Sequence, residues 1–503
     1  MNQYWPSAGG PAPTYPSLQG DLQVDVVVIG AGIVGLTAAE LLRRGGKRVA
    51  VLEALRVGRQ ATGKSTAKIT SQHGLTYRKL IDDLGEPRAA DYAAANQAAI
   101  RRIEGFVKEL AIDCAFEHKA AYLYGRAEES VPALEAEVEA ALRLGLPASF
   151  TRELPLPFPV AGAIRFDGQA QFDPVRYLDG LAAAFAREGQ LFENTRVTKV
   201  ESGEPCRVET ESGATVTADH VVVATQIPTV PDGMFFAKAY PFAHPMAAGR
   251  VDPARAPDGM FKSTDEPSHS FRVDRRNGET YLVAAGGTYK PGHTEEATEL
   301  AEELERFLQE AFGIEEVAYR WTSEDFSPMD GLPFVGRASS GSPLLVATGF
   351  KAWGITNGTA AGAILSDLVL GCENSWAAVF DATRLRPAAG GPTFLKENLE
   401  VAGHFVKDRL FGSRSSEVEL APGQGAVFEV EGEKLAVSKD ADGRLHALSA
   451  ICSHLGCVVG WNSIDRSWDC PCHGSRFLED GSVLTGPATT ALERRELAPP
   501  GDE

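Results

Sequence analysis

The sequence predicts two folds in one chain: an α/β domain with a buried parallel sheet and, after it, a small all-β domain. Three observations predict this arrangement. A strand, a glycine triplet, a helix and a second strand follow one another over residues 24–53. Two short clusters of cysteine and histidine lie within residues 452–473. Between residues 417 and 449, short apolar runs alternate with turn signals, which is typical of a β-meander.

Length and composition limit the kinds of protein that this chain can form. Its 503 residues are too many for one hydrophobic core. The net charge of −19 disfavours nucleic acid and anionic membrane surfaces as partners, since their phosphates would be repelled. We find no signal peptide and no apolar run of about 18 residues that would span a bilayer. We therefore expect a cytoplasmic protein without a membrane span.

The first element is the segment VDVVVIG, residues 24–30, a β-branched run suited to a strand buried on both faces. It leads into GAGIVG, residues 30–35, and then into a helical pattern that ends at paired glycines. In such a unit the glycines permit a tight turn and the approach of a pyrophosphate to the helix amino terminus. Glu53 ends the second strand, where a carboxylate would bind ribose hydroxyls. An acid here disfavours a 2′-phosphate, so this unit predicts FAD or NAD.

Three later segments favour FAD. Residues 59–74 are rich in Gly, Ser and Thr and could line a cofactor with hydrogen-bond donors. Residues 217–225 form another buried strand pattern, and residues 330–371 place glycines before a helix. The sequence shows no second strand–glycine–helix unit, so we do not expect a separate NAD(P)H site.

Together these segments resemble the D-amino-acid oxidase-like superfamily, which includes glycine oxidase and sarcosine oxidase. The resemblance implies an α/β FAD-binding Rossmann-type domain with an inserted α+β substrate domain. It places the first glycine motif at the FAD pyrophosphate and the late glycine segment against the isoalloxazine. The FAD contacts that it implies are Gly30, Ala31, Gly32, Ile33, Val34, Gly35, Glu53, Ser65, Thr66, Val197, Gly349, Trp353, Gly354, Ile355 and Thr356.

The middle of the chain is predicted to be scaffold around a pocket. Alanine-rich helical patterns cover residues 87–112 and 128–145. Residues 270–292 read as two strands around an Asn-Gly turn. In enzymes of the superfamily, such a sheet covers the substrate pocket.

Four side chains are candidates for the chemistry. His73 is a candidate base or substrate contact, and Lys351 could place positive charge near the reduced flavin ring. Arg272 could hold a substrate carboxylate in a bidentate manner, and Tyr289 could line the pocket. Each of these residues could equally be structural.

The carboxy-terminal clusters are CSHLGC, residues 452–457, and CPCHGS, residues 470–475. The first supplies Cys452 and His454, and the second supplies Cys470 and His473. Two thiolates and two imidazoles suit a Rieske [2Fe-2S] centre, and they also suit tetrahedral zinc.

Further residues resemble the Rieske proteins of the respiratory and photosynthetic cytochrome complexes. Cys457 and Cys472 occupy positions that form a disulfide in those proteins, and a zinc site would leave this pair unexplained. Residues 486–487, Gly-Pro, resemble the loop that covers the cluster. Ser475 is retained, but Phe477 stands where the pattern has a tyrosine that donates a hydrogen bond. We therefore predict a Rieske cluster with a lower potential than in those complexes.

These observations predict the order of the domains. Residues 1–22 form an irregular arm, and residues 23–385 form the FAD-dependent oxidoreductase unit. Residues 386–416 form a linker with an amphipathic helix at 397–412, and residues 417–503 form a small all-β Rieske domain.

The expected function joins both cofactors. FAD would accept a hydride from the C–N bond of a small amine or amino acid, and the imine formed would hydrolyse. Electrons would then pass singly to the cluster and on to an external acceptor, for which a redox protein is one candidate. The alternatives are an electron-transfer component in which electrons enter at the cluster, or a non-catalytic redox sensor. A Rieske oxygenase is not expected, because its second iron needs downstream histidines and none follows His473.

Overall fold

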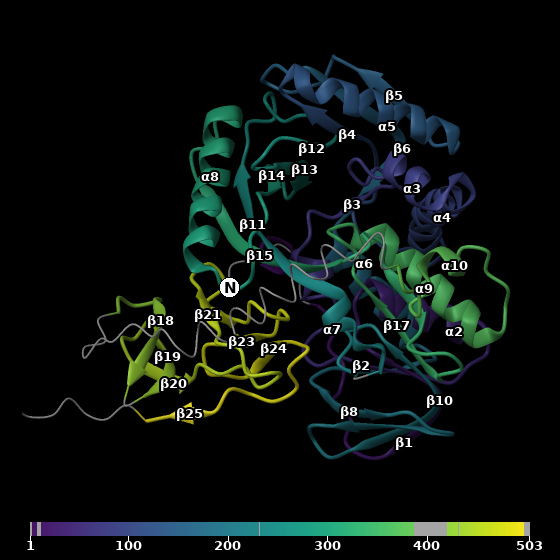
Figure 1. Ribbon diagram of the computed structural model, residues 1–503, viewed down its shortest axis with the longest axis vertical. Helices are drawn as coiled ribbons and strands as arrows, with labels where there is room; N and C mark the ends of the chain where they lie inside the picture. Colours follow the sequence, from purple (N-terminus) through teal and green to yellow (C-terminus); the bar gives the residue numbers. More distant parts are fainter. Residues whose placement is uncertain (1–2, 8–11, 231, 387–419, 431, 497–503) are drawn as a thin grey trace, which may run out of the picture.

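The computed structural model describes residues 3–7, 12–230, 232–386, 420–430 and 432–496. Figure 1 shows the helices and strands coloured along the sequence, with the yellow carboxy-terminal domain packed against the larger part of the molecule. The helix predicted at residues 397–412 lies outside the described residues.

The first sheet carries the glycine motif. Among the described residues it contains eight strands: β1 (Leu22–Ile29), β2 (Val49–Leu52), β7 (Gln190–Phe192), β8 (Val197–Glu201), β9 (Cys206–Thr210), β10 (Thr215–Val223), β16 (Phe334–Arg337) and β17 (Leu344–Thr348). Its main path runs β16-β17-β10-β1-β2-β7, and β1 pairs in parallel with both β10 and β2. The buried strands predicted at residues 24–30 and 217–225 are confirmed as β1 and β10.

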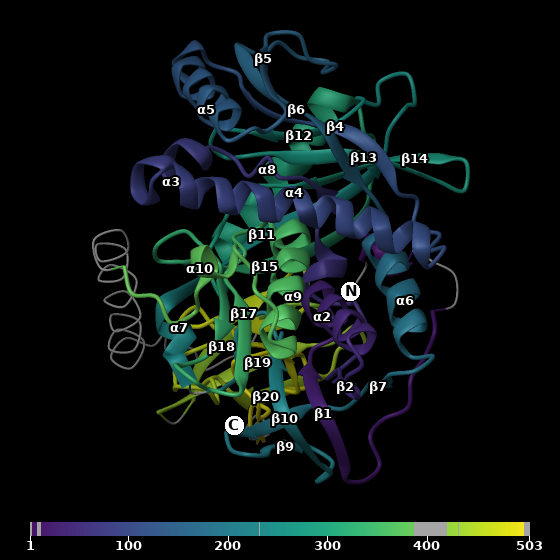
Figure 2. The same cartoon turned by 90° about the vertical axis from the view of Figure 1, so that its right-hand side faces the viewer.

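Two helices cover one face of this sheet. They are α2 (Ile33–Arg44), which follows the glycine motif, and α9 (Gly354–Leu370), which follows the late glycine segment. Figure 2 shows them side by side. A Cβ atom on Gly362 would lie 2.9 Å from the carbonyl oxygen of Val34, so the close crossing requires glycine.

A second sheet covers the other side of the cofactor region and contains nine strands of the described chain. These are β3 (Lys68–Ile69), β4 (Glu117–Gly125), β5 (Ala148–Thr151), β6 (Gly162–Gln171), β11 (Ala239–Arg250), β12 (Met260–Ser263), β13 (Ser270–Arg276), β14 (Glu279–Ala285) and β15 (Val317–Pro328). The predicted hairpin is confirmed as β13 and β14, and Asn277 and Gly278 in its turn both have positive φ.

The other helices surround these sheets. They are α3 (Tyr77–Leu84), α4 (Glu86–Glu109), α5 (Val131–Arg143), α6 (Pro174–Phe185), α7 (Phe235–Lys238), α8 (Thr294–Phe312) and α10 (Ala377–Phe380), with short 3₁₀ turns η1 (Ala61–Lys64), η2 (Glu128–Ser130) and η3 (Asp232–Met234). The alanine-rich patterns predicted as helices correspond to α4 and α5. No helix in the described ranges is both long and apolar enough to cross a bilayer.

The carboxy-terminal domain is all-β, as predicted. Its described residues form two sheets of four strands: β18 (Gly425–Val430), β19 (Glu433–Lys439), β20 (Leu445–Ser449) and β25 (Arg494–Arg495) in one, and β21 (Gly460–Asn462), β22 (Ser467–Asp469), β23 (Arg476–Leu478) and β24 (Val483–Thr485) in the other. The two cysteine–histidine loops connect β20 to β21 and β22 to β23. A core that includes Trp461, Trp468 and Phe477 packs against these loops.

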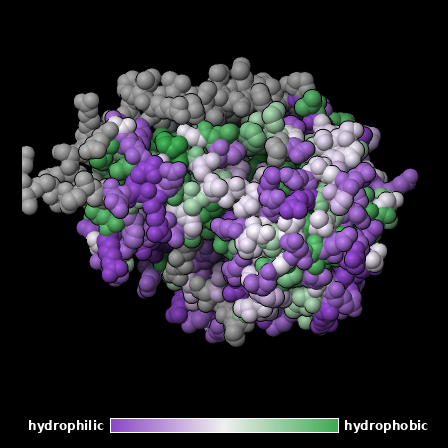
Figure 3. Space-filling model, turned by 90° about the horizontal axis from the view of Figure 1, so that it is seen from below, coloured by the Kyte–Doolittle hydropathy of each residue, from purple (hydrophilic) through white to green (hydrophobic). Residues whose placement is uncertain are grey.

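The amino-terminal segment is more ordered than an irregular arm. Its residues Tyr4–Ser7 form the short helix α1, and the side chains of Tyr4 and Trp5 are 0% exposed. The Trp5 indole donates a hydrogen bond to the carbonyl oxygen of Ser65, 2.8 Å away, and packs against the Arg272 guanidinium. The arm therefore supports the loop that carries Ser65. The face seen from below mixes hydrophilic and hydrophobic side chains (Figure 3).

Candidate cofactor and substrate site

A cavity of about 600 Å³ lies where the two sheets and the carboxy-terminal domain meet. Its walls come from the β1–α2 loop, the segment around η1, the start of α9, and strands β11 to β14. The loop after β24 of the carboxy-terminal domain closes part of the same cavity. Segments that are far apart in the sequence therefore form one site.

The glycine motif at one end of the cavity fits a dinucleotide. Gly30 has a φ of +102°, and a Cβ atom there would lie 2.5 Å from the carbonyl oxygen of Ala224. A Cβ atom on Gly35 would lie 1.9 Å from the carbonyl oxygen of Gly30. Gly32 instead borders the cavity, and the nearest atom to a Cβ there is Thr62 Oγ1 at 3.4 Å. The backbone thus leaves room for a pyrophosphate at the amino terminus of α2.

Glu53 lies beside this motif at the carboxyl end of β2. Its carboxylate accepts hydrogen bonds from the backbone N–H groups of Ala31, at 2.8 Å, and Leu55, at 2.9 Å. Burial raises the pKa of Glu53. Val197 also lines the cavity. Two residues before it, the backbone N–H of Thr195 donates a hydrogen bond to the carbonyl oxygen of Glu53 at 2.8 Å, which holds this segment beside Glu53.

Most of the expected FAD contacts line the cavity. Those that do are Gly30, Gly32, Ile33, Val34, Glu53, Ser65, Thr66, Val197, Trp353, Gly354, Ile355 and Thr356. Three others shape the walls from behind. Ala31 binds Glu53, Gly35 packs on Gly30, and Gly349 packs against Pro328 with a φ of +77°.

His73 lines the cavity but has little freedom to exchange protons. Its Nδ1 lies 2.7 Å from the Tyr92 hydroxyl, and its Nε2 lies 2.8 Å from the carbonyl oxygen of Thr70. The ring stacks on Trp353, with ring centroids 4.9 Å apart. Burial lowers the pKa of His73 to about 3, so the imidazole is neutral at pH 7. This geometry favours a positioning role for His73 next to the start of α9.

The opposite end of the cavity is cationic. Lys351 lines it as expected, and so does Lys262 on β12, which sequence reasoning missed. Among the described residues, no carboxylate oxygen lies within 4.0 Å of either ammonium group. Burial lowers the pKa of Lys262; the negative charge of Glu266 opposes this effect, and the positive charge of Lys351 adds to it. Two unpaired cations in one cavity favour an anionic occupant.

Arg272 does not lie in this cavity. It is 1% exposed, and its Nε and Nη2 donate to the carbonyl oxygens of Thr66, at 2.7 Å, and Phe172, at 2.6 Å. Asp274 lies 3.5 Å from Nη1. The guanidinium is therefore occupied by the protein itself, and this geometry argues against the expected contact with a substrate carboxylate.

Tyr289 also lies outside the cavity. It is 3% exposed, and its backbone pairs with Ala243. Asp469, Arg476 and Asp465 of the carboxy-terminal domain are close enough to affect its pKa, which burial raises. Tyr289 therefore belongs to the contact between the domains and not to the expected substrate pocket.

The two cysteine–histidine loops bring four potential ligands together. Cys452 and Cys470 are free, buried thiols, and the rings of His454 and His473 lie 5.0 Å apart. A hydrogen bond with Cys470 lowers the pKa of Cys452 to about 7. The Nδ1 atom of His454 is buried and has no partner in the described part of the chain. Two thiols and two imidazoles, one with an orphaned nitrogen, fit the ligand set of a Rieske centre.

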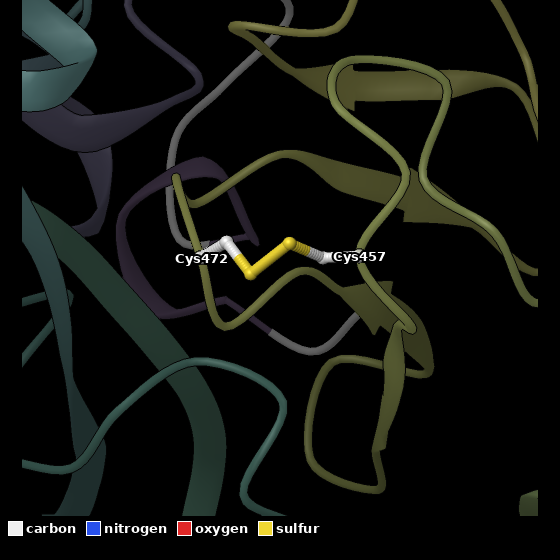
Figure 4. The surroundings of a disulfide bond; sticks show 2 residues. All are labelled: Cys457 and Cys472. Carbon is white, nitrogen blue, oxygen red and sulfur yellow. A yellow bond between two sulfur atoms is a disulfide. The ribbon is translucent and has the colours of Figure 1, made fainter. Parts of the chain in front are cut away.

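The second pair of cysteines joins the two loops. Cys457 and Cys472 form a disulfide, as the resemblance implied (Figure 4). The histidine side of this site faces the larger part of the molecule. Phe236 on α7 packs edge-on against both histidine rings, at centroid distances of 5.2 Å to His454 and 5.4 Å to His473.

A buried polar network holds the carboxy-terminal domain in place. Lys64, in η1 beside the cavity, lies 3.2 Å from an Asp465 carboxylate oxygen. That carboxylate also accepts hydrogen bonds from Thr322 on β15 and from Arg476 on β23. All four residues are at most 2% exposed. Since buried charges are tolerated only when paired, the domains have one well-defined docking position here.

Fold and sites thus define a class of protein, an oxidoreductase that combines a dinucleotide-binding domain with an iron–sulfur domain. Comparison with known proteins agrees. A family model described as FAD dependent oxidoreductase matches residues 25–368, and a model described as Rieske [2Fe-2S] domain matches residues 412–496. The chain belongs to this FAD-dependent oxidoreductase family and carries a carboxy-terminal Rieske domain. Its cofactors are FAD and a [2Fe-2S] cluster.

Relatives share this arrangement or part of it. The protein YhfW of Bacillus subtilis (strain 168), named as a Rieske 2Fe-2S iron–sulfur protein, is 34% identical over 98% of this chain and 97% of its own length. Glycine oxidase from Geobacillus kaustophilus superposes with a TM-score of 0.60 at 20% identity, covering 73% of this chain and all of its own. L-Amino acid deaminase from Proteus myxofaciens superposes with a TM-score of 0.60 at 18% sequence identity, covering 75% of this chain and 97% of its own length. These two structures show the fold.

Proposed function

We propose that the chain is a dehydrogenase that oxidises a C–N bond in a small amino acid or amine and delivers the electrons from FAD to its own Rieske cluster. The observation that carries this proposal is the shared cavity wall. Residues of the Rieske domain line the cavity that also contains the glycine motif and the start of α9. A cluster domain that forms part of the wall of the FAD cavity is suited to receive electrons from FAD.

The proposal assigns roles to the residues already described. Cys452, His454, Cys470 and His473 hold the cluster, and the cavity residues expected from the resemblance hold FAD. When bound, FAD supplies two-electron acceptance from the substrate and the cluster supplies one-electron transfer. Phe236 excludes water from the side of the two histidines that faces the FAD domain.

The cationic end of the cavity would bind the substrate. Lys262 takes the part that was expected of Arg272, since its side chain lines the cavity, whereas the Arg272 guanidinium is occupied by backbone carbonyl oxygens and Asp274. A substrate carboxylate there would form a charge-assisted hydrogen bond, worth about 1.5–3 kcal/mol. The two superposed structures are a glycine oxidase and an L-amino acid deaminase, which supports an amino acid as the substrate class.

Anaerobic mixing with a panel of amino acids and N-methylated amines tests the proposal. A true substrate should bleach the flavin absorbance, and the reduced-Rieske EPR signal should then appear without any added carrier. Lys262→Met should lower kcat/KM for a carboxylate substrate by about 10–100-fold, and Lys262→Arg should retain most of it. Lys108→Met, at an exposed lysine outside the cavity lining, is the matched control.

Two results would contradict the proposal. If no small molecule bleaches the flavin but a reduced ferredoxin does so through the cluster, the chain is an electron-transfer component. If the flavin bleaches and the cluster stays oxidised, the cofactors work separately.

A further inference from the structure

The loop after β24 borders both cofactor sites. Its residues Leu484, Thr485, Gly486, Ala488 and Thr489 line the cavity of the FAD domain. In the Rieske proteins of the cytochrome complexes, the corresponding Gly-Pro loop covers the cluster. Here its other side faces a nucleotide site.

The contacts of this loop with the FAD domain are specific. Arg196, directly before β8, donates a hydrogen bond from Nη2 to the carbonyl oxygen of Val483 at 2.7 Å. Gly486 packs so closely on Thr229 that a Cβ atom would lie 2.9 Å from the Thr229 methyl group. Leu484 is 7% exposed. The FAD domain therefore fixes the loop from one side.

The cluster site fixes the loop from the other side. The Ala488 backbone N–H donates a hydrogen bond to Ser475 Oγ at 3.0 Å. Ser475 is fully buried and follows the cluster ligand His473 by two positions. The position of the loop thus depends on the peptide that carries the cluster ligands.

The neighbouring residues show which end of FAD would meet this loop. Arg196 lies between Thr195 and Val197, and Thr195 is hydrogen-bonded to the backbone of Glu53. Glu53 ends β2, and in parallel α/β sheets the nucleoside binds beyond the carboxyl ends of the strands. The loop therefore lies next to the adenosine end of the cavity.

We propose that the Rieske domain completes the FAD site: residues 484–489 contact the adenosine part of FAD, with Thr485 and Thr489 as hydroxyl partners, so that FAD binding and cluster binding stabilise each other. Neither family by itself supplies this contact, because it exists only where the two domains meet. Coupling between two sites is reciprocal, so each cofactor should strengthen the binding of the other by the same factor.

FAD titration of the apoflavoprotein, followed by flavin fluorescence, tests this in the full chain without any substrate. The double variant Thr485→Val/Thr489→Val should raise the Kd of FAD at least about fivefold, the lower end of typical coupling. The control is Thr490→Val, because Thr490 is exposed and does not line the cavity. Circular dichroism of each variant identifies misfolded protein.

The second measurement leaves the sequence unchanged. Wild-type protein stripped of its cluster by a chelator should bind FAD at least about fivefold more weakly than the cluster-loaded protein. Conversely, saturating FAD should slow cluster loss to the chelator, measured by the visible circular dichroism of the cluster. Equal FAD Kd values with and without the cluster, together with an unchanged Kd in the folded double variant, would overturn the inference. The absence of a substrate keeps this result independent of the proposed dehydrogenase activity.

Discussion

Phe477 occupies a fully buried position on β23, between Trp468 on the neighbouring strand and the core of the cluster domain. A phenylalanine cannot donate a hydrogen bond to a ligand sulfur, whereas a tyrosine at this position could. Such a donor stabilises the extra negative charge of a reduced cluster.

We therefore predict that Phe477→Tyr raises the reduction potential of the cluster. A redox titration followed by EPR measures this directly. Phe428→Tyr is a suitable control, because Phe428 packs in a separate small cluster of the same domain. An unchanged or lower potential in Phe477→Tyr would show that Phe477 does not set the potential.

At this scale, motif residues were predictable from the sequence and pocket residues were not. Glycines that need positive φ and cysteines at fixed spacing can be recognised in a single sequence; Gly30 has a positive φ, and Cys452 is a buried, free thiol. Lys262 carries no such signal, since an ordinary strand lysine looks the same. Arg272 and Tyr289 were expected in the substrate pocket but do not line the cavity, because the sequence of a strand does not reveal which of its two faces points toward the cavity.

Helix α1 has only four residues, but it contacts segments that are distant in the sequence. Trp5 is fully buried, donates its indole N–H to Ser65 and packs on Arg272. The sequence around it, rich in proline and glycine, predicted an irregular arm, because a helix of four residues is decided by tertiary packing and not by local propensity. The patterns at α4, α5 and the β13–β14 hairpin are local and were predicted, whereas we made no prediction from the sequence for α8, β11 or β15.

We predict that Trp5→Ala lowers the free energy of unfolding by about 3–5 kcal/mol, since it leaves a large cavity under the FAD loop. Urea unfolding monitored by flavin fluorescence measures this, and the bound FAD should be released at a lower urea concentration. Trp376→Ala, at a partly buried tryptophan, should lower the free energy of unfolding by a smaller amount. Equal losses for both variants would contradict a special role of α1.

At the scale of the whole molecule, Asp465 connects the two halves. Burial would raise its pKa, but the charges of Lys64 and Arg476 outweigh burial and hold the pKa of Asp465 well below its usual range. Because the folded-state pKa is depressed, its contribution to stability is complete above the unfolded value of about 4 and is lost as the pH falls further.

Asp465→Asn should therefore destabilise the protein by roughly 3–5 kcal/mol at pH 7, since it leaves the buried Lys64 without its carboxylate partner and leaves Arg476 with only its second partner, Asp469. The difference from wild type should stay constant from about pH 7 to about pH 5 and shrink below about pH 4. Denaturant unfolding at several pH values measures it, with the exposed Asp442→Asn as the control. A difference that grows on acidification would contradict this assignment.

The wall that residues 484–489 give to the nucleotide cavity also bears on how the protein is made. Gly30 leaves the ribosome early, but the cavity to which it belongs stays open on one side until Thr489 has been synthesised and the last strands have folded. Full affinity for FAD is then reached only late in synthesis, and chains that stop before Thr489 should hold the nucleotide more weakly than the complete chain.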